Sequence, residues 1–316
     1  MVKKVAFLFP GQGSQTVGMG KDIYDNYEAA KNIYDTADKV LGKSITKLCF
    51  EGPEEDLKLT VNTQPCIVTT SIALMEVLRK ELNIYLPDYT AGHSLGEYCA
   101  MYTAGVMSLE TTLKLIQKRA DLMGATKGGS MAAILNASEE VLKAGLEEGS
   151  KVGYVDVANY NSPAQVVITG DENAVKAAGD YILTNGARRV VPLAVSGAFH
   201  SKFMQEAGAV FAEFIEDADL NDSSIPVITN VDAGLTTSAE DFRAKMPKQI
   251  YSSVHWTQTI QKMVEEGVDT FIEIGPGKVL AGLNKKIAPD TVVYNVFDKP
   301  SLENTVALLK EQMANV

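Results

Sequence analysis

The sequence predicts an α/β fold in which a small domain is inserted into a larger one. Short apolar runs alternate with amphipathic segments of helix length, and this alternation is typical of a mainly parallel sheet covered by helices. A glycine-rich joint at residues 127–130 interrupts the alternation. After the joint two strands follow each other directly, and the first pattern resumes further along the chain. We therefore expect a large domain formed by residues 1–127 and 198–316, and a small domain formed by residues 128–197.

The first part of the chain contains alternating strands and helices. The apolar run from Lys3 to Phe9 predicts a buried first strand, which ends where Pro10 and Gly11 follow. The next predicted elements are a helix near Lys21 to Leu41, a helix from Ile67 to Leu82, a short strand from Tyr89 to Ala91, a helix from Glu97 to Thr103 and a helix from Leu109 to Met123.

The sequence pattern in the middle of the chain predicts six elements in the order βαββαβ. A ferredoxin-like domain has its elements in this order. They are Met131 to Leu135, Ser138 to Glu148, Val152 to Ala158, Gln165 to Thr169, Glu172 to Thr184 and Arg189 to Val195. In the last part we expect strands from Pro226 to Asn230 and from Thr270 to Ile274, and a closing helix from Leu302 to Met313. A cleft between the two domains is the expected place for a ligand site.

Composition and charge exclude several classes of protein. The chain has 316 residues, 46% of them hydrophobic and 22% charged, which is ordinary for a soluble globular protein of about two domains. No apolar run approaches the roughly 18 residues of a membrane span. The net charge of -11 disfavours a nucleic-acid partner, because phosphate binding needs clustered Lys and Arg. The three cysteines have no CxxC spacing, so we expect no metal site, no disulfide framework and a cytoplasmic location.

Residues 92–96, Gly-His-Ser-Leu-Gly, match the GxSxG pattern of a nucleophile elbow. In this motif the turn from strand to helix is so tight that glycines are needed on both sides of the serine. A strand is predicted before the motif and a helix after it, which is the context that the motif requires. Ser94 is therefore the predicted nucleophile.

A serine nucleophile needs a base, and the chain contains three histidines. His93 adjoins Ser94 and should leave the turn in another direction, and His255 lies at the expected start of a helix, so both are interpreted as structural. His200 follows the last strand of the small domain and is the base by elimination. No Asp or Glu stands out as the acid of a triad, so a backbone carbonyl could orient the imidazole instead.

A loop and an arginine each allow two interpretations. The loop at residues 9–15 (FPGQGSQ) fits neither GxGxxG nor GxxxxGK[ST]. Its backbone N–H groups, with that of Leu95, could face an oxyanion, or the loop could be a plain structural turn. Arg119 lies in an amphipathic helix. It is either a surface arginine or, if it points into the cleft, a bidentate partner for a substrate carboxylate.

Seven motifs are spread over nearly the whole chain. They are FPGQGSQ at 9–15, NTQP at 62–65, GHSLGEY at 92–98, QKRADLM at 117–123, NYNSPAQVVITG at 159–170, GAFHS at 197–201 and EIGPGKVL at 273–280. Together and in this order they closely resemble the malonyl-CoA:acyl carrier protein transacylases of bacterial fatty acid synthesis, a family related to the acyltransferase domains of polyketide synthases.

The resemblance implies an α/β-hydrolase-like large domain with an inserted ferredoxin-like (βαββαβ) small domain. It also implies transfer of a malonyl group from malonyl-CoA to the phosphopantetheine thiol of acyl carrier protein, by a ping-pong mechanism through an ester on Ser94. The coenzyme A thioester is then a substrate, and no cofactor is expected. Malonyl-CoA and acyl carrier protein are the expected partners, and we expect a monomer.

The resemblance further implies roles for single residues. Ser94 would be the nucleophile and His200 the base and acid. The other implied residues are the oxyanion-hole amides of Gln12 and Leu95, the carboxylate ligand Arg119, the backbone carbonyl of Gln249 that holds His200, and the substrate contact Phe199. Asn161 would contact either the substrate or a residue that contacts it. The ring of Phe199 would leave little room for a methyl group on the acyl α-carbon, and a pocket methylene is worth ~1 to 3 kcal/mol of discrimination.

Two other functions remain open from the sequence. A serine hydrolase would share Ser94 and His200 but would need a visible acid and no carboxylate-binding arginine. A catalytically silent module that binds carrier protein would not be acylated at Ser94. Because the chain is acidic, docking of an acidic carrier protein would need a local basic patch, for which the candidates are Lys202, Lys278, Lys285 and Lys286.

Overall fold

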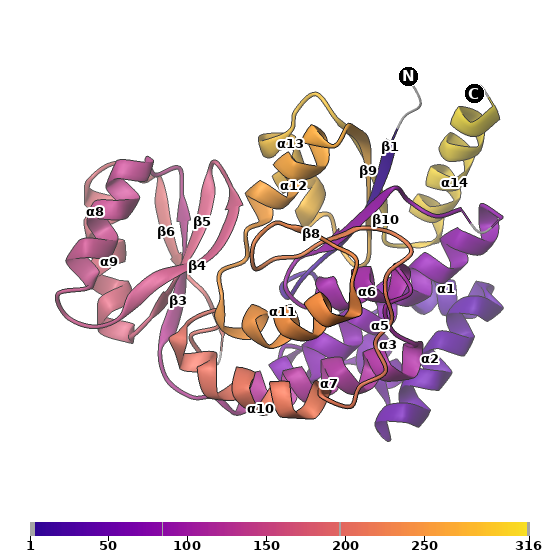
Figure 1. Cartoon of the computed structure of the whole chain (residues 1–316), viewed down its shortest axis with the longest axis horizontal. Coiled ribbons are helices and arrows are strands. Elements are labelled where there is room, and N and C mark those ends of the chain that lie inside the picture. The colour runs from indigo at the N-terminus through magenta and orange to yellow at the C-terminus, as the bar shows by residue number, and fades with distance from the viewer. Residues whose placement is uncertain (1–3, 84, 196, 315–316) are drawn as a thin grey trace.

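The computed structural model describes residues 4–83, 85–195 and 197–314, which fold around two separate β-sheets (Figure 1). The larger sheet has six strands and the smaller has four. Lys3, the first residue of the strand predicted at the start of the chain, lies outside the described residues. The protein is thus a mixed α/β protein, as the sequence predicts.

The larger sheet is mainly parallel and has the strand order β10-β9-β1-β2-β7-β8. Its strands are β1 (Lys4–Phe9), β2 (Tyr89–Gly92), β7 (Val227–Ile228), β8 (Leu235–Thr236), β9 (Val268–Ile274) and β10 (Val292–Val296). Among the described residues of this sheet, only β7 and β8 pair in antiparallel fashion.

Strand β1 shows why this sheet is covered on both faces. Val5, Phe7 and Phe9 pack into one apolar cluster, whereas Ala6 and Leu8 pack into another on the opposite face. Because successive side chains of a strand point to opposite faces, an unbroken apolar run is what a strand with two buried faces requires.

Helices lie on both faces of this sheet (Figure 1) and contribute side chains to both clusters. In the first part of the chain they are α1 (Lys21–Asn26), α2 (Glu28–Leu41), α3 (Ile45–Glu51), α4 (Glu54–Leu57), α5 (Thr60–Glu81), α6 (Gly96–Thr103) and α7 (Leu109–Ala125). After the smaller sheet come η1 (Lys202–Met204), α10 (Gln205–Ile215), α11 (Ala239–Tyr251), α12 (Trp256–Glu265), α13 (Val279–Ile287) and α14 (Lys299–Ala314).

The smaller sheet is antiparallel and has the strand order β4-β5-β3-β6. Its elements are β3 (Ser130–Leu135), α8 (Glu139–Gly149), β4 (Val155–Ser162), β5 (Gln165–Gly170), α9 (Glu172–Thr184) and β6 (Arg189–Pro192). The two helices lie on the same side of this sheet and share an apolar cluster with it (Figure 1). The predicted succession of six elements is therefore present.

One helix prediction is wrong because the chain bends where the pattern continues. The single helix expected from Lys21 to Leu41 is two helices, α1 and α2. Tyr27 lies between them in an extended conformation, with φ -131° and ψ 119°, and its N–H donates to the carbonyl of Ile23. The amphipathic pattern continues across this bend and does not reveal it.

The helix expected to start at Ile67 starts instead at Thr60, although Pro65 lies within it. Proline has no N–H and leaves the carbonyl four residues earlier without its helical donor. Here that carbonyl, of Val61, accepts hydrogen bonds from Lys43 Nζ (3.1 Å) and Gln117 Nε2 (3.2 Å). Tertiary contacts thus replace the missing bond, and the helix continues through the proline.

Several strand limits also differ from the prediction. β4 begins at Val155 because the preceding residues continue the turn after α8, where the Val152 N–H donates to the Gly149 carbonyl. β6 ends at Pro192, the last residue that pairs with β3. The strand expected from Pro226 to Asn230 is only β7. The elements that the sequence did not predict include β10, α10, α11 and α13.

Candidate active site

Ser94 lies in a tight turn between β2 and α6, in a left-handed conformation with φ 52°. Both glycines of the motif are required by close backbone packing. A Cβ atom on Gly92 would collide with the backbone of Gly96, and one on Gly96 would collide with the carbonyl of Phe9. The GxSxG sequence therefore forms a strained elbow at the end of a buried strand, as the motif requires.

His200 faces Ser94, with 2.9 Å between its Nε2 and the Ser94 Oγ. On the other side of the ring, Nδ1 lies 3.0 Å from the carbonyl oxygen of Gln249 and 3.1 Å from that of Ser252. A carbonyl can only accept, so Nδ1 carries the proton of the neutral ring and Nε2 is free to accept one from Ser94. Two backbone carbonyls thus do the orienting that an acid does in a triad.

The surroundings of His200 keep its imidazole neutral. Burial, together with the nearby charges of Arg119 and His93, lowers the pKa of His200 to about 3. The hydrogen bonds to the two backbone carbonyls act in the opposite direction. At neutral pH the ring is therefore unprotonated, as a base must be before it takes a proton.

Arg119 is fully buried, which excludes the interpretation as a surface arginine. Its Nη1 donates to Gln64 Oε1 at 2.6 Å, and its Nη2 donates to Gln249 Oε1 at 2.9 Å and to Ser94 Oγ at 3.0 Å. All three partners are neutral, and within the described ranges no carboxylate forms an ion pair with this guanidinium. Its Nε has no partner there either.

A cavity of about 110 Å³ opens in front of Ser94. The smaller sheet, helices α5 and α7 and the segments that follow β1, β2 and β6 contribute to its lining, which consists of Gln12, Gln64, His93, Ser94, Leu95, Arg119, Met123, Met131, Asn159, Leu193, Val195, Phe199 and His200. The backbone N–H groups of Gln12 and Leu95 have no acceptor among the described residues. Two unused donors at the wall that carries the nucleophile could stabilise an oxyanion.

The sequence of the whole chain matches one family of enzymes. Residues 6–293 fit the family model described as an acyl transferase domain. A malonyl CoA-acyl carrier protein transacylase of Bacillus subtilis is 44% identical over 318 residues, which cover 99% of this chain and 100% of the relative. The chain belongs to the malonyl CoA-acyl carrier protein transacylase family. It is therefore an acyltransferase.

Solved structures agree with this assignment to the transacylase family. An acyl carrier protein S-malonyltransferase of Vibrio cholerae has a TM-score of 0.92 at 38% identity, covering 96% of this chain and 100% of that one. A malonyl-transacylase in holo complex with its type II PKS acyl-carrier protein has a TM-score of 0.93 at 36% identity, covering 96% and 99%.

The remaining residues expected at the transacylase site lie in two places. Phe199 lines the cavity next to His200. Asn161 is not among the lining residues, but its Oδ1 lies 2.8 Å from Nε2 of His93, which does line the cavity. His93 also packs against Trp256, and His255 stacks on Tyr160 at the start of α12. In the described part of the chain neither histidine forms a hydrogen bond with Ser94 Oγ, in keeping with their interpretation as structural residues.

Three polar side chains of the transacylase site were not predicted. Gln64 lies in the NTQP motif and holds one arm of the arginine, and the Gln249 side chain holds the other. Asn230 accepts a hydrogen bond from the Ser94 N–H at 2.8 Å. The sequence contains a signal only for Gln64, which belongs to the NTQP motif at residues 62–65.

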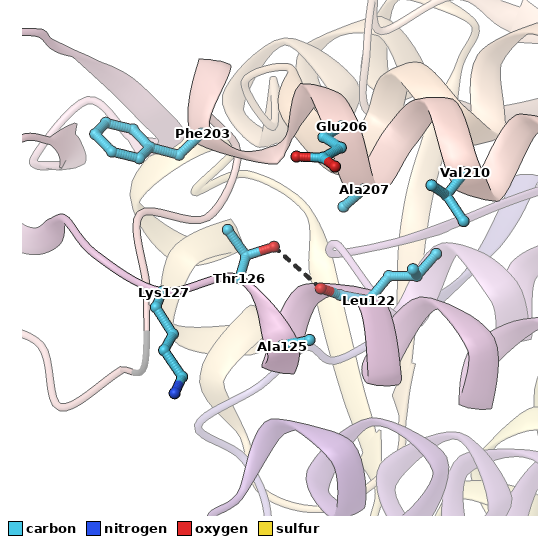
Figure 2. Close-up of a pocket in the computed structure, with 8 residues that line it drawn as sticks. All are labelled: Leu122, Ala125, Thr126, Lys127, Phe203, Glu206, Ala207 and Val210. Carbon is cyan, nitrogen blue, oxygen red and sulfur yellow. Dashed lines mark hydrogen bonds between the residues drawn. The ribbon is translucent and has the colours of Figure 1, made fainter.

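A second, larger cavity of about 490 Å³ lies between α7 and α10 (Figure 2). It is lined by Leu122, Ala125, Thr126, Lys127, Phe203, Glu206, Ala207 and Val210, none of which lines the cavity at Ser94. In the described part of the chain no helix is long and apolar enough to cross a membrane, and no group of three or more His, Cys, Asp or Glu residues could hold a metal ion.

Proposed function

We propose that this transacylase moves a malonyl group from malonyl-CoA to the phosphopantetheine thiol of an acyl carrier protein, through an ester on Ser94. The observation that carries the proposal is the buried guanidinium of Arg119 beside the Ser94 hydroxyl, without a carboxylate partner in the described part of the chain. Burying an unpaired charge is costly, and a substrate carboxylate would compensate it. The names of the similar proteins, which specify malonyl-CoA and acyl carrier protein, support this substrate.

The first half of the reaction forms the ester. His200 Nε2 takes the proton of Ser94 Oγ as the oxygen attacks the thioester carbonyl, and the N–H groups of Gln12 and Leu95 stabilise the resulting oxyanion. The carbon–sulfur bond then breaks. Coenzyme A leaves as its thiol after His200 returns the proton to sulfur, and Arg119 holds the free carboxylate of the malonyl group.

The second half repeats these steps with another thiol. The phosphopantetheine thiol of the carrier protein gives its proton to His200 and attacks the ester carbonyl. The carbon–oxygen bond to Ser94 breaks, and His200 returns the proton to the serine. Because water could also attack the ester, the site must keep water away from it until the arm of the partner reaches the cavity.

The proposal includes a division of the chain into domains. Residues 1–127 and 198–316 form an α/β-hydrolase-like domain, and residues 128–197 form an inserted ferredoxin-like domain. Two observations support this division. All strands of the smaller sheet lie within residues 128–197, and residues of both sheets or their connections line the cavity at Ser94.

The proposed enzyme is a cytoplasmic monomer without a cofactor, and it supplies extender units for fatty acid synthesis. Phe199 borders the acyl group and disfavours a methyl branch on its α-carbon. For carrier-protein docking the candidate lysines are all exposed, with Lys202 on η1 and Lys278, Lys285 and Lys286 at the start and end of α13.

Intact-protein mass spectrometry after mixing with malonyl-CoA tests the proposal. The wild-type protein should gain one malonyl group, and Ser94→Ala should gain none, because among the described residues that line the cavity no other serine, threonine or cysteine is present. Ser201→Ala, which changes a buried serine that instead donates to the Ala198 carbonyl, is the matched control and should keep the adduct. A stoichiometric adduct on Ser94→Ala would contradict the assignment.

A further inference from the structure

Asn230 is fully buried and contacts the nucleophile elbow on both sides of Ser94. Its Oδ1 accepts the Ser94 N–H at 2.8 Å, and its Nδ2 donates to the Gly92 carbonyl at 2.8 Å. The two bonds use the opposite ends of one amide, so the side chain has a single orientation. Neither an aspartate nor an alanine can make both bonds.

Gln249 joins Asn230 to the residue proposed as the base. Its Nε2 donates to the Ser94 carbonyl at 2.8 Å and to Asn230 Oδ1 at 3.3 Å. Its own backbone carbonyl accepts from His200 Nδ1 at 3.0 Å. Asn230 is therefore bonded to the backbone that carries the nucleophile and to the residue that orients the base.

Glu97 holds Asn230 from behind. This residue lies in the first turn of α6 and is buried, and its Oε2 accepts the Asn230 backbone N–H at 2.6 Å. Burial raises the pKa of Glu97 to about 7, against the lowering effects of the Asn230 N–H, Arg119 and Lys245. A carboxylic acid, a carboxylate and a glutamine amide can all accept this bond.

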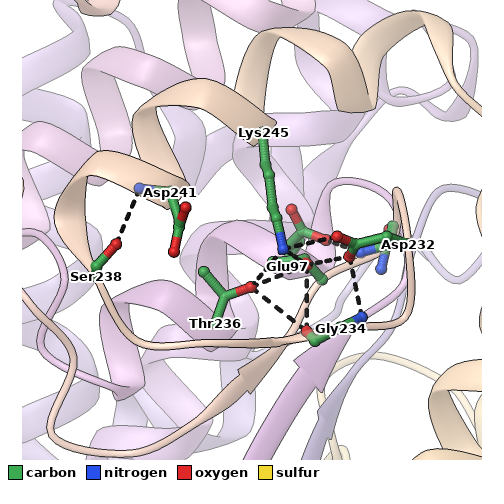
Figure 3. A network of polar contacts seen from close by, with 9 residues as sticks. Glu97, Asp232, Gly234, Thr236, Ser238, Asp241 and Lys245 are labelled. Atoms are coloured by element: carbon green, nitrogen blue, oxygen red, sulfur yellow. Dashed lines mark hydrogen bonds and ion pairs between the residues drawn. The ribbon is translucent and has the colours of Figure 1, made fainter.

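A network of polar contacts fixes the turn that carries Asn230 (Figure 3). Asp232 accepts from Thr229 Oγ1 and from the Gly234 N–H, both at 2.9 Å. Figure 3 shows Lys245 extending from its helix to Asp232 and Thr236. Its Nζ lies 2.8 Å from Asp232 Oδ2 and 2.8 Å from Thr236 Oγ1. Because Lys245 and Gln249 are four residues apart on α11, one helix face holds both the turn and the base.

We propose that Asn230 is a positioning residue for acylation. It holds the backbone of the Ser94 elbow so that the Ser94 hydroxyl faces His200, and Glu97 acts through its hydrogen bond to Asn230. This inference rests on the proposed function. Without the amide, the Ser94 N–H loses its acceptor and the left-handed turn loses its support. A displacement of reacting groups by about 1 Å can reduce a rate by about 10²-fold.

The test measures single-turnover acylation by malonyl-CoA with the full chain. Asn230→Ala should acylate about 10²-fold more slowly at saturating malonyl-CoA, with little change in the concentration for half-maximal rate, because the residue does not line the cavity. The matched control is Thr236→Val, which removes a buried hydroxyl of the same network that does not contact the elbow. This control should lose stability to urea but keep the wild-type acylation rate.

An acylation rate of Asn230→Ala within about threefold of wild type would overturn the inference, as would an equal loss of rate in Thr236→Val, since generic loosening would then explain both. If Asn230→Ala does not fold, the comparison of Glu97→Gln with Glu97→Leu tests the inference. Glu97→Gln keeps the acceptor and should stay within about threefold of wild type, whereas Glu97→Leu should lose at least about tenfold. Equal rates for these two variants would overturn the role of Glu97.

The same experiment separates this inference from the proposed function. If wild-type protein forms no malonyl ester, the proposed function fails, whatever the variants do. If the wild type forms the ester and Asn230→Ala forms it equally fast, only the positioning role fails.

Discussion

The surroundings of His200 lower the pKa of its imidazole far below the ordinary value. An ordinary imidazole has a pKa of about 6.5 and would lose about tenfold of its neutral form between pH 7.5 and pH 5.5. Because the pKa of His200 is lowered to about 3, its neutral form persists over this whole range. We expect kcat/KM for acylation to be flat from pH 8 to pH 5.5. A tenfold fall centred near pH 6.5 in stopped-flow measurements of coenzyme A release would contradict this expectation.

Substrate binding should change the same pKa. The charge of Arg119 is one of the causes that lower the pKa of His200, and a bound carboxylate would neutralise that charge. The pKa of His200 should therefore be higher in the malonyl complex than in the free enzyme. The profile of kcat, which reports the complex, should then bend at a higher pH than that of kcat/KM.

Arg119 distinguishes a malonyl transferase from a general serine acyltransferase. Truncating one partner of a buried charge pair costs ~2 to 5 kcal/mol, so Arg119→Ala should lower malonyl transfer by about 30-fold to several thousandfold. Arg119→Lys should recover only part of this loss, because a point charge cannot reproduce the planar fork. Acetyl-CoA has no carboxylate, and its loading should be unchanged or faster.

The measurement for Arg119 is the ratio of malonyl to acetyl kcat/KM. Arg79→Ala is the control, since this arginine is partly exposed on α5 and pairs only weakly with Glu76 at 3.7 Å. The control should keep the wild-type ratio. An unchanged ratio in Arg119→Ala would show that the guanidinium does not bind the malonyl carboxylate.

The site residues that can be predicted from the sequence are those that lie in a local sequence motif or can be found by elimination. Site residues without such a signal are missed. Ser94 follows from GxSxG alone, because the backbone of the elbow needs glycine at both neighbours. His200 follows from elimination among three histidines. Asn230 and the Gln249 side chain reach the site from more than 100 residues away along the chain. Nothing in their local sequence indicates that contact.

At the scale of elements, tertiary contacts explain most differences between prediction and structure. The predicted start of α5 is Ile67, but the helix begins earlier and continues through Pro65, because Lys43 and Gln117 satisfy the carbonyl that the proline leaves free. The earlier start matters for the site, because it places Gln64 within the helix that faces Arg119. Helix α11 was not predicted, although its Lys245 and Gln249 support the turn and the base.

The elements predicted well are those with a strong period and clear ends. α9 has the predicted limits, from Glu172 to Thr184, and β1 follows its apolar run to Phe9. β7 is much shorter than its sequence pattern, since it pairs with β2 at one position only, Thr90 with Val227. How far a strand pairs depends on its neighbours in the sheet, which local sequence does not specify.

At the scale of the whole molecule, the candidate site combines residues of the smaller sheet with residues of helices and of segments that follow strands of the larger sheet. The first part of the chain contributes Ser94, the proposed nucleophile, and Arg119, and the segment after the smaller sheet contributes His200, the proposed base. The four-stranded sheet contributes Met131 and Asn159 to the cavity wall. In the proposed reaction, malonyl-CoA and the carrier protein would therefore bind against residues of the smaller sheet and of the segments around Ser94.

The partition of the isolated malonyl-enzyme between thiol and water tests the central claim most directly. The enzyme is loaded with labelled malonyl-CoA, freed of coenzyme A, and mixed with carrier protein that either carries or lacks its phosphopantetheine arm. The label should move from Ser94 to the thiol of the carrier protein that has the arm, while the ester stays intact with the other carrier protein and in buffer alone. Release of free malonate at the same rate in all three mixtures would show a hydrolase and contradict the account.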